Sequence, residues 1–388
     1  MKLAVVGGAL QGVEVAYLAR KAGFEVILID RKSMVPARGL CDHFQQIDIL
    51  DAGALDPVLQ EVDLVFPALE SQLGLAKLHG WAGSRGIPIV HDPDAYAISS
   101  SKIASEAFFC RCGFPVPESW PDCRFPVIAK PSRGSGSAGI RIFATERDMQ
   151  ACIKDTPASE GWLVQEFLDG PSYSVEVMRT PGCTVAFQVT DLQMDDRYDC
   201  KRVLAPSALP PERIEELKTL SINIADALDL LGLIDVEVIL SDETFKVLEI
   251  DARFPSQTPI TVYWSCGINM VHALARCTIA GDCPVAAVPS QPGKGTVLEH
   301  IEVSPGKLSV TGERVMAHAG PLDVRRDFFG ADEALTNYAP GKMRWVATLI
   351  CTGTDAADAW QHRDEVISAI RRHLGPVEYS DPSPQKVL

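Results

Sequence analysis

The sequence predicts a fold of mixed α/β and α+β class, in which an N-terminal Rossmann-like domain precedes a larger body. Residues 2–30 indicate a βαβ unit: a strand at 2–6, a helix that ends near Ala22, and a strand at 25–29. Two β-branched runs, 234–240 and 245–250, flank a polar turn and predict a β-hairpin. An amphipathic pattern over 212–231 predicts a long helix just before that hairpin.

Composition limits the class of protein. The chain has 388 residues, 46% of them hydrophobic, which is enough for a large core in two or three domains. Its net charge of −15 argues against nucleic-acid partners, whose binders usually present a basic face. The 11 cysteines show neither a paired framework nor zinc spacing, so we expect reduced thiols in the cytoplasm. The chain shows no signal peptide and no run of 18 apolar residues, so no membrane partner is expected.

The predicted hairpin contains a group of carboxylates. Glu237 lies on its first strand, and Glu249 and Asp251 lie on one face of the second, because side chains alternate with a period of two. Three carboxylates on one sheet face repel each other unless cations lie among them. Such oxygen ligands suit Mg²⁺, and Arg253 follows close by to pair with a phosphate or a carboxylate. The alternative is an acidic hairpin edge that faces solvent.

A glycine-rich segment lies upstream of the hairpin. Lys130 ends a predicted strand, and Gly134, Gly136 and Gly139 follow it among serines before the next strand. Such glycines let backbone N–H groups approach phosphate oxygens, and the lysine supplies a positive charge. The segment is not a Walker P-loop, because its lysine precedes the glycines. Alone it could be a flexible turn; together with the acidic hairpin it predicts nucleotide binding.

The N-terminal βαβ unit suggests a second hypothesis. Its turn, Gly7 to Gly12, follows the pattern Gly-x-Ala-x-x-Gly, and Asp30 stands 18 residues after Gly12. This pattern is typical of dinucleotide-binding domains and favours a nicotinamide-dependent dehydrogenase. Ala9, however, replaces a glycine of that motif and hinders the close approach of a pyrophosphate. The dehydrogenase hypothesis also leaves the acidic hairpin and Lys130 unexplained.

Together these motifs resemble those of the ATP-grasp superfamily. The resemblance covers Lys102 ahead of a helix, Lys130 before the glycine-rich segment, a hinge over 163–170, and the acidic hairpin. It implies an ATP-grasp fold behind the Rossmann-like domain, with ATP and two Mg²⁺ ions as cofactors. It also implies that ATP phosphorylates one substrate's carboxylate and that an amine then displaces the phosphate. A non-catalytic ATP-binding protein would keep the glycine-rich segment but would lose the carboxylates.

The resemblance assigns roles to individual residues. Catalytic roles are implied for Lys130 and Arg253. The implied metal ligands are Glu237, Glu249 and Asp251. The implied ATP-binding residues are Lys102, Ile128, Lys130, Ser135, Gly136, Ser137, Gln165, Glu166, Phe167 and Leu248.

Two of these assignments have alternatives, and the residue that binds the ribose is open. Lys102 could be a cation on the surface of a helix, and Glu166 could be an exposed side chain at a strand edge. Ser172 stands where many family members have a ribose-binding glutamate. Glu166 or Glu176 would then have to bind the ribose.

Within the superfamily, segments 198–200, 249–259, 265–269 and 299–300 are similar to the pyrrolysine-biosynthesis ligases. Those enzymes join 3-methyl-D-ornithine to the ε-amine of L-lysine, so small-molecule partners of the diamino-acid class are implied. The expected substrate-binding residues are Leu10, Gln11, Glu70, Glu176, Asp199, Arg253, Ser256 and Gln257. Glu70 could instead be a plain surface residue, and Cys200 is expected to pack rather than to act as a nucleophile. An ATP-grasp ligase of another amino-acid pair remains an alternative.

We expect three parts along the chain. These are the Rossmann-like domain at 1–94, a catalytic domain at 95–290 with a lid at about 115–162, and an α+β portion at 291–388. Pro93 marks the first boundary. Helices are expected at 97–112, 145–154 and 356–374, and strands at 64–67 and 87–90. The sequence leaves a homodimer open.

Overall fold

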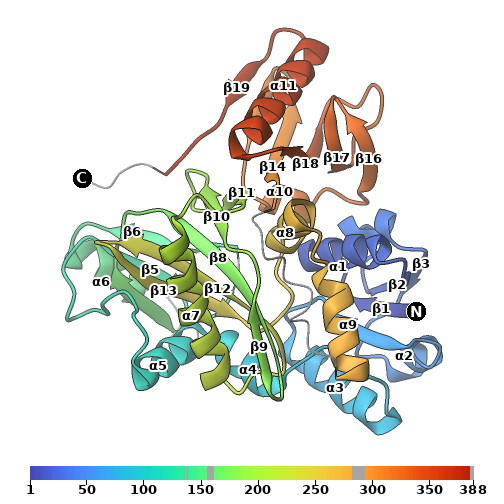
Figure 1. The fold of residues 1–388 in the computed structure, drawn as a ribbon, viewed down its shortest axis with the longest axis horizontal. Coiled ribbons are helices and arrows are strands. Elements are labelled where there is room, and N and C mark those ends of the chain that lie inside the picture. Colours follow the sequence, from blue (N-terminus) through green and yellow to red (C-terminus); the bar gives the residue numbers. More distant parts are fainter. Residues whose placement is uncertain (135, 138, 155–160, 282–292, 385–388) are drawn as a thin grey trace.

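The computed structural model describes residues 1–134, 136–137, 139–154, 161–281 and 293–384 of the chain. Its strands form a four-stranded, a three-stranded and a twelve-stranded sheet. Figure 1 shows the N-terminal and three-stranded sheets on opposite sides of the molecule, with the C-terminal strands above both. The predicted mixed α/β and α+β class is therefore confirmed, whereas the exact division into domains stays a prediction.

The N-terminal part is a parallel α/β unit. Its sheet has the order β3-β2-β1-β4, and all its pairs are parallel. The apolar strands β1 and β4 are almost fully buried, because helices cover both faces of such a sheet. Its elements are β1 (Lys2–Val6), α1 (Leu10–Lys21), β2 (Glu25–Asp30), η1 (Pro36–Leu40), β3 (His43–Gln46), α2 (Ala52–Leu59), β4 (Leu64–Pro67) and α3 (Gln72–Arg85). The βαβ prediction is confirmed, but the strand expected at 87–90 is only an isolated bridge between Val65 and Ile89.

The helix predicted over 97–112 is in fact two helices, α4 (Pro93–Ser99) and α5 (Lys102–Cys112). The backbone is extended at Ser101, whose side-chain oxygen accepts a hydrogen bond from the N–H of Ala104 at 3.3 Å. Serine is a favoured N-cap because it satisfies a free N–H group of the first turn. The break places Lys102 at the start of α5, where its N–H donates to the carbonyl of Ser132 at 2.8 Å.

The three-stranded sheet carries the glycine-rich segment. Its order is β6-β5-β7, with β5 (Val127–Pro131) antiparallel to both β6 (Arg141–Phe143) and β7 (Trp162–Glu166). Helix α6 (Glu146–Lys154) covers this sheet through Met149, which packs in one apolar cluster with Val127. The predicted order of strand, glycine-rich turn, strand and helix is confirmed.

The twelve-stranded sheet joins the acidic hairpin to the C-terminal part. Its main path runs β13-β12-β8-β10-β11-β14-β18-β17-β16, while β9, β15 and β19 pair beside that path. The strands are β8 (Ser172–Thr180), β9 (Cys183–Ala186), β10 (Thr190–Met194), β11 (Cys200–Ala205), β12 (Gly232–Ser241), β13 (Thr244–Asp251), β14 (Gly295–Ser304), β15 (Lys307–Val310), β16 (Asp323–Phe328), β17 (Ala331–Thr336), β18 (Trp345–Gly353) and β19 (Glu378–Ser380).

Helices cover this large sheet. Helix α7 (Pro211–Ala227) ends four residues before the predicted Leu231, because the chain turns at Asp229, where φ is 52°, and then enters β12. Helix α11 (Ala356–Leu374) has the predicted bounds. The remaining helices are α8 (Thr258–Cys266), α9 (Met270–Ala280) and α10 (Arg314–Ala317). Within the described ranges, no helix combines the length and the apolar character that a membrane span requires.

A shared apolar core fixes the N-terminal unit against the large sheet. One buried cluster contains Leu18 of α1, Ile260 of α8, Leu274 of α9 and Leu298 of β14. Glu14 of α1 adds a polar contact, since the N–H of Ile260 donates to its carboxyl group at 2.7 Å. The N-terminus of α1 and the end of the acidic hairpin therefore meet at one place, around which the candidate site is built.

Candidate active site

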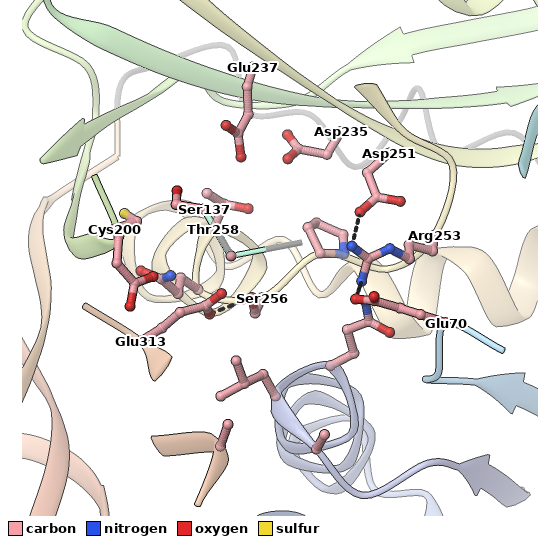
Figure 2. A pocket seen from close by; sticks show the side chains of 18 of the residues that line it. Glu70, Ser137, Cys200, Asp235, Glu237, Asp251, Arg253, Ser256, Thr258 and Glu313 are labelled. Atoms are coloured by element: carbon pink, nitrogen blue, oxygen red, sulfur yellow. Dashed lines mark hydrogen bonds and ion pairs between the residues drawn. The ribbon is translucent and has the colours of Figure 1, made fainter. Parts of the chain in front are cut away.

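The hairpin of β12 and β13 presents four carboxylates. In the antiparallel register Glu237 lies opposite Glu249, and Asp235 lies opposite Asp251, so all four share one face. Figure 2 shows Asp235, Glu237 and Asp251 next to one another at the edge of a cavity. Asp235 was not predicted from the sequence, although the two-residue alternation that relates Glu249 to Asp251 also relates Asp235 to Glu237.

Burial makes this carboxylate group electrostatically costly. It raises the pKa of both Asp235 and Glu237 well above the ordinary values, and the neighbouring carboxylates raise them further. Burial likewise raises the pKa of Asp251 to about 7, against the opposing effect of Arg253. A bound cation would reverse these shifts, because it favours the ionised form.

Two of the hairpin carboxylates already have cationic partners. Glu249 Oε1 lies 2.7 Å from Lys102 Nζ, and Asp251 Oδ2 lies 2.6 Å from Arg253 Nη2. Among the residues that the structure describes, no three Asp, Glu, His or Cys side chains are placed to hold a metal ion by themselves. Mg²⁺ usually takes only one or two carboxylates and completes its shell with phosphates and water. The hairpin therefore fits a Mg²⁺ ion that binds together with a nucleotide.

A cavity of about 190 Å³ lies between the three-stranded sheet and the hairpin. The predicted adenine contacts Ile128 and Leu248 line it, together with Lys102, Lys130 and Phe167. Lys130 is only 6% exposed, and burial lowers the pKa of its ammonium group. Within the described part of the chain this ammonium group makes no hydrogen bond or ion pair, although the charges of Glu249 and Glu237 oppose the effect of burial, so an anionic ligand would be its natural partner.

The hinge residues Gln165, Glu166 and Phe167 already make hydrogen bonds within the protein. Glu166 lines the cavity, but one of its carboxylate oxygens accepts a hydrogen bond from the N–H of Glu118 at 2.8 Å. The Gln165 side chain is buried and donates to Glu106 at 2.9 Å. The N–H of Phe167 donates to the carbonyl of Pro126 at 3.0 Å, so adenine would need another backbone group of this segment.

The glycine-rich segment contributes to both cavities of the site. Gly136 and Ser137 line the larger cavity, and Ser137 also lines the smaller one. The backbone of Ser137 has a positive φ of 55°, and its hydroxyl donates to the carbonyl of Tyr198. The prediction for Ser135 lies outside the described residues.

The larger cavity, of about 470 Å³, is formed by segments that are far apart in the sequence. The N-terminal unit supplies Leu10, Gln11 and Glu70, as expected from the sequence. The later segments supply the predicted residues Asp199, Arg253, Ser256 and Gln257. Glu70 is exposed, and its Oε1 lies 2.9 Å from Arg253 Nη1 at the edge of the cavity (Figure 2).

One predicted substrate residue does not reach the cavity, and one residue that does reach it was not predicted. Glu176 is fully buried, is absent from the cavity lining, and has a pKa that burial raises to about 7. Glu313 lines the cavity and accepts a hydrogen bond from the hydroxyl of Ser256 at 2.6 Å. No sequence motif surrounds Glu313, so only its position in the fold reveals it.

Cys200 also lines the larger cavity. Burial raises the pKa of its thiol well above the ordinary value, and the thiol donates to the carbonyl of Arg202 at 3.5 Å. A nucleophilic cysteine needs a lowered pKa. These features support the expectation that Cys200 packs and is not a nucleophile.

The residues of the N-terminal glycine turn make contacts within the protein that account for their identity. The Asp30 carboxylate, which would bind ribose in a dinucleotide site, accepts hydrogen bonds from the N–H groups of Gly8 and Lys32, each at 2.8 Å. A Cβ atom at Gly12 would lie 2.1 Å from the carbonyl oxygen of Gly7, so this glycine is needed for packing of α1 on β1. The turn thus requires no dinucleotide to explain its residues.

Comparison with known structures finds similar folds that cover 95–96% of this chain. The chain superimposes on the ADP complex of N5-carboxyaminoimidazole ribonucleotide synthetase with a TM-score of 0.70 and 14% identity, over 96% of this chain and 97% of that one. The biotin carboxylase domain of Hydrogenobacter thermophilus 2-oxoglutarate carboxylase gives a TM-score of 0.73 and 16% identity, over 95% and 89% of the two chains. These likenesses show the fold alone.

Sequence comparison shows the family. Residues 99–257 match the model of an ATP-grasp domain. The chain is 31% identical to the 3-methyl-D-ornithine–L-lysine ligase of Methanosarcina barkeri, over 97% of this chain and 99% of that one. It is 30% identical to the ligase of the same name from Methanosarcina mazei, over 96% of each chain. The chain therefore belongs to the ATP-grasp ligases, in one family with these two proteins, and is an ATP-dependent enzyme that forms amide bonds.

Proposed function

We propose that the enzyme joins the carboxyl group of 3-methyl-D-ornithine to the ε-amine of L-lysine, in the cytoplasm, as a step of pyrrolysine biosynthesis. The names of the full-length relatives suggest this pair of substrates. One structural observation supports it best: a lysine-lined cavity and a carboxylate-lined cavity adjoin and share Ser137, Glu237 and Glu249. A triphosphate in the first cavity would reach an ammonium-bearing amino acid in the second.

The reaction proceeds in two displacements. A carboxylate oxygen of the first amino acid attacks the γ-phosphorus of ATP, an O–P bond forms, and ADP leaves with the electrons of the broken bond. The amine of the second amino acid then attacks the acyl carbon, inorganic phosphate leaves, and the nitrogen loses a proton. The enzyme contributes orientation, neutralisation of charge and exclusion of water, and needs no covalent nucleophile.

The proposed roles follow from the position of each side chain. Lys102 and Lys130 line the nucleotide cavity and would neutralise phosphate oxygens. Arg253 extends into the substrate cavity between Asp251 and Glu70, where it would stabilise the acyl phosphate. Glu70 would pair with a substrate ammonium group.

The acidic hairpin would hold the metal ions. Glu237, Glu249 and Asp251 are the proposed ligands, and Asp235 is close enough to add a fourth carboxylate. Two Mg²⁺ ions bound there would neutralise the charge that builds up on the phosphates during transfer.

A second candidate is a ligase of the same type for another amino-acid pair. Ornithine and 3-methylornithine differ by one methyl group, which a pocket distinguishes by only about 1–3 kcal/mol. The decisive experiment combines ATP with pairs of lysine, D-ornithine and 3-methyl-D-ornithine and identifies the products by mass spectrometry. We expect methylornithyl-lysine with release of ADP and phosphate. Preferential formation of another dipeptide would replace the proposed substrates.

The nicotinamide hypothesis has a separate test. Because Asp30 is engaged by backbone donors and Ala9 carries a Cβ atom, NAD and NADP should not bind at millimolar concentration. Calorimetry with ATP as the positive control measures this directly. Saturable NAD binding would contradict the proposed role of the N-terminal unit.

A further inference from the structure

The substrate cavity has a second acidic region away from Arg253. Figure 2 shows Glu313 and Cys200 on one side of the cavity and Glu70 with Arg253 on the other. Asp199 lines the same cavity and is 5% exposed. Burial raises the pKa of Asp199 to about 6, and the charge of Glu313 raises it further, so these two carboxylates interact with each other.

The backbone brings the two carboxylates together. Asp199 accepts a hydrogen bond from the N–H of Arg314 at 3.1 Å, directly beside Glu313 in the chain. A Cβ atom at Gly312 would lie 2.2 Å from the carboxyl carbon of Asp199, so only glycine permits this approach. The N–H of Gly312 also donates to Asp195 at 3.0 Å, which fixes segment 312–314 against the loop before β11.

Within the described part of the chain no cation forms an ion pair with these two carboxylates, although Arg253 and Arg314 act on them from a greater distance. Neither Glu313 nor Asp199 makes an ion pair there, unlike Glu70, Glu249 and Asp251, which all do. The neighbouring Arg314 is exposed, and its guanidinium donates to the carbonyl of Gly136. Two interacting carboxylates without a cation of their own favour a cationic ligand.

A second observation indicates a ligand with N–H donors. Gln257 is 7% exposed, lines the cavity, and has a side-chain oxygen with no hydrogen-bond partner. The backbone of Gln257 has a positive φ of 72°, which is unusual for this residue type and is found preferentially at functional sites. Ser256, its neighbour, orients the Glu313 carboxylate through the 2.6 Å hydrogen bond. A buried acceptor without a donor is costly unless a ligand supplies one.

We propose that Glu313, Asp199 and the side-chain oxygen of Gln257 form a subsite for a substrate ammonium group that takes no part in the chemistry. The subsite makes the enzyme select amino acids that bear a second ammonium group. This inference rests on the proposed function, because it assumes that the large cavity binds the amino acids. The ammonium group belongs either to the side chain of the carboxyl donor or to the α-carbon of the amine donor.

The test compares substrates that differ in one ammonium group. For the carboxyl donor the pair is D-ornithine and D-norvaline, which lacks the side-chain amine. For the amine donor the pair is L-lysine and 6-aminohexanoate, which lacks the α-amine. The measured quantity is the ratio of kcat/KM within each pair, for the wild-type enzyme and for the Glu313→Gln variant.

We expect Glu313→Gln to reduce one of the two ratios by about 10- to 100-fold, as the loss of a hydrogen bond to a charged group predicts. The affected ratio identifies which substrate places its ammonium group there. The value of kcat/KM for the analogue that lacks that amine should hardly change. Glu313→Asp should restore part of the preference, and Glu302→Gln, at an exposed glutamate of β14, should change neither ratio.

Other results would overturn the proposal. If Glu313→Gln lowers kcat/KM equally for both members of each pair, Glu313 either has a structural role or binds the α-ammonium group that both carboxyl donors share, and the proposed selection of a second ammonium group is refuted. If circular dichroism shows that this variant is unfolded, Glu313→Asp and Ser256→Ala replace it in the same assay, and unchanged ratios in both overturn the subsite. A wild-type enzyme that forms no product from any pair would instead refute the proposed function, so the two failures are distinguishable.

Discussion

The two cavities differ in charge and in construction. The smaller one has apolar walls at Ile128 and Leu248 and contains two lysines. The charged side chains that line the larger one are carboxylates, except for Arg253, which is held between two of them. The smaller cavity also contains four carboxylates, so its two lysines suit a polyanion that arrives together with Mg²⁺. A cationic amino acid suits the larger cavity.

The boundary between the cavities is where the opposing charges meet. Glu237 and Glu249 line both compartments, and Lys102 pairs with Glu249 at 2.7 Å. A triphosphate and these carboxylates would repel each other without intervening cations. We therefore expect phosphate transfer, and the need for Mg²⁺, at this boundary. Variants of single residues test whether the two cavities bind different reactants, from the largest expected effect on activity to the smallest.

Glu249→Gln should have the largest effect. The change removes a proposed metal ligand and the partner of Lys102, so we expect ligation to slow by about 10²–10³-fold while folding is retained. Phosphate release and product formation measure the loss, and Glu302→Gln on the exposed side of β14 is the matched control. Turnover near the wild-type rate in a correctly folded variant would refute a metal site at the boundary.

Lys130→Met tests the nucleotide compartment alone. The buried ammonium group makes no hydrogen bond or ion pair among the described residues, so its loss should raise the KM for ATP by about 10- to 100-fold. The KM values of the amino acids should stay the same. Steady-state kinetics with each substrate varied in turn provides the measurement, and Lys77→Met, an exposed lysine of α3, is the control. An effect on the amino-acid KM values alone would reverse the assignment of the two cavities.

Glu70→Ala tests the substrate compartment alone. Its carboxylate, 2.9 Å from Arg253, faces the larger cavity, so we expect the KM of a diamino acid to rise by about tenfold with an unchanged affinity for ATP. Isothermal titration with ATP and steady-state kinetics with the amino acids separate the two effects. The control is Glu61→Ala, whose side chain is 71% exposed. A rise limited to the KM for ATP would assign Glu70 to the nucleotide instead.

The last prediction concerns the pH dependence of stability instead of activity and comes from helix α1, beside the substrate compartment. Burial raises the pKa of Glu14 to about 8 from an ordinary value of 4.5. The unfolded chain therefore loses this proton first, and the contribution of Glu14 to the free energy of unfolding falls as pH rises from about 4.5 to about 8. The slope is at most about 1.4 kcal/mol per pH unit.

Glu14→Gln should remove that contribution while it keeps an acceptor for the N–H of Ile260. Denaturant unfolding of both proteins between pH 5 and 8 measures the difference, which should increase in favour of the variant at higher pH. Parallel pH profiles would show that the Glu14 carboxyl titrates normally in the folded enzyme.

The contrast between the two cavities also explains which residues could be found from the sequence. Lys130, the glycine-rich segment and the acidic hairpin are local patterns, and each lies on the element that the sequence predicts. Asp235 could have been predicted, because it lies two residues before Glu237 on β12 and side chains two residues apart on a strand share a face. Glu313 could not, because its place depends on contacts between Asp195 and Gly312, which are 117 residues apart. The local motifs of the nucleotide site are therefore predictable, and so are seven of the eight expected substrate residues, which line the larger cavity, whereas Glu313 is not.

The separation of the sheets has a mechanical consequence. Lys130 lies on the three-stranded sheet, while the hairpin carboxylates and the strands that lead to Glu313 belong to the twelve-stranded sheet. No strand pairing joins these two sheets in the described part of the chain. A tilt of the small sheet would therefore break no ladder hydrogen bonds, each of which contributes about 1 kcal/mol. We expect ADP to leave by such a tilt, which would move Gly136 and Ser137 away from the amino-acid cavity while the rest of its lining stays with the large sheet and the N-terminal unit.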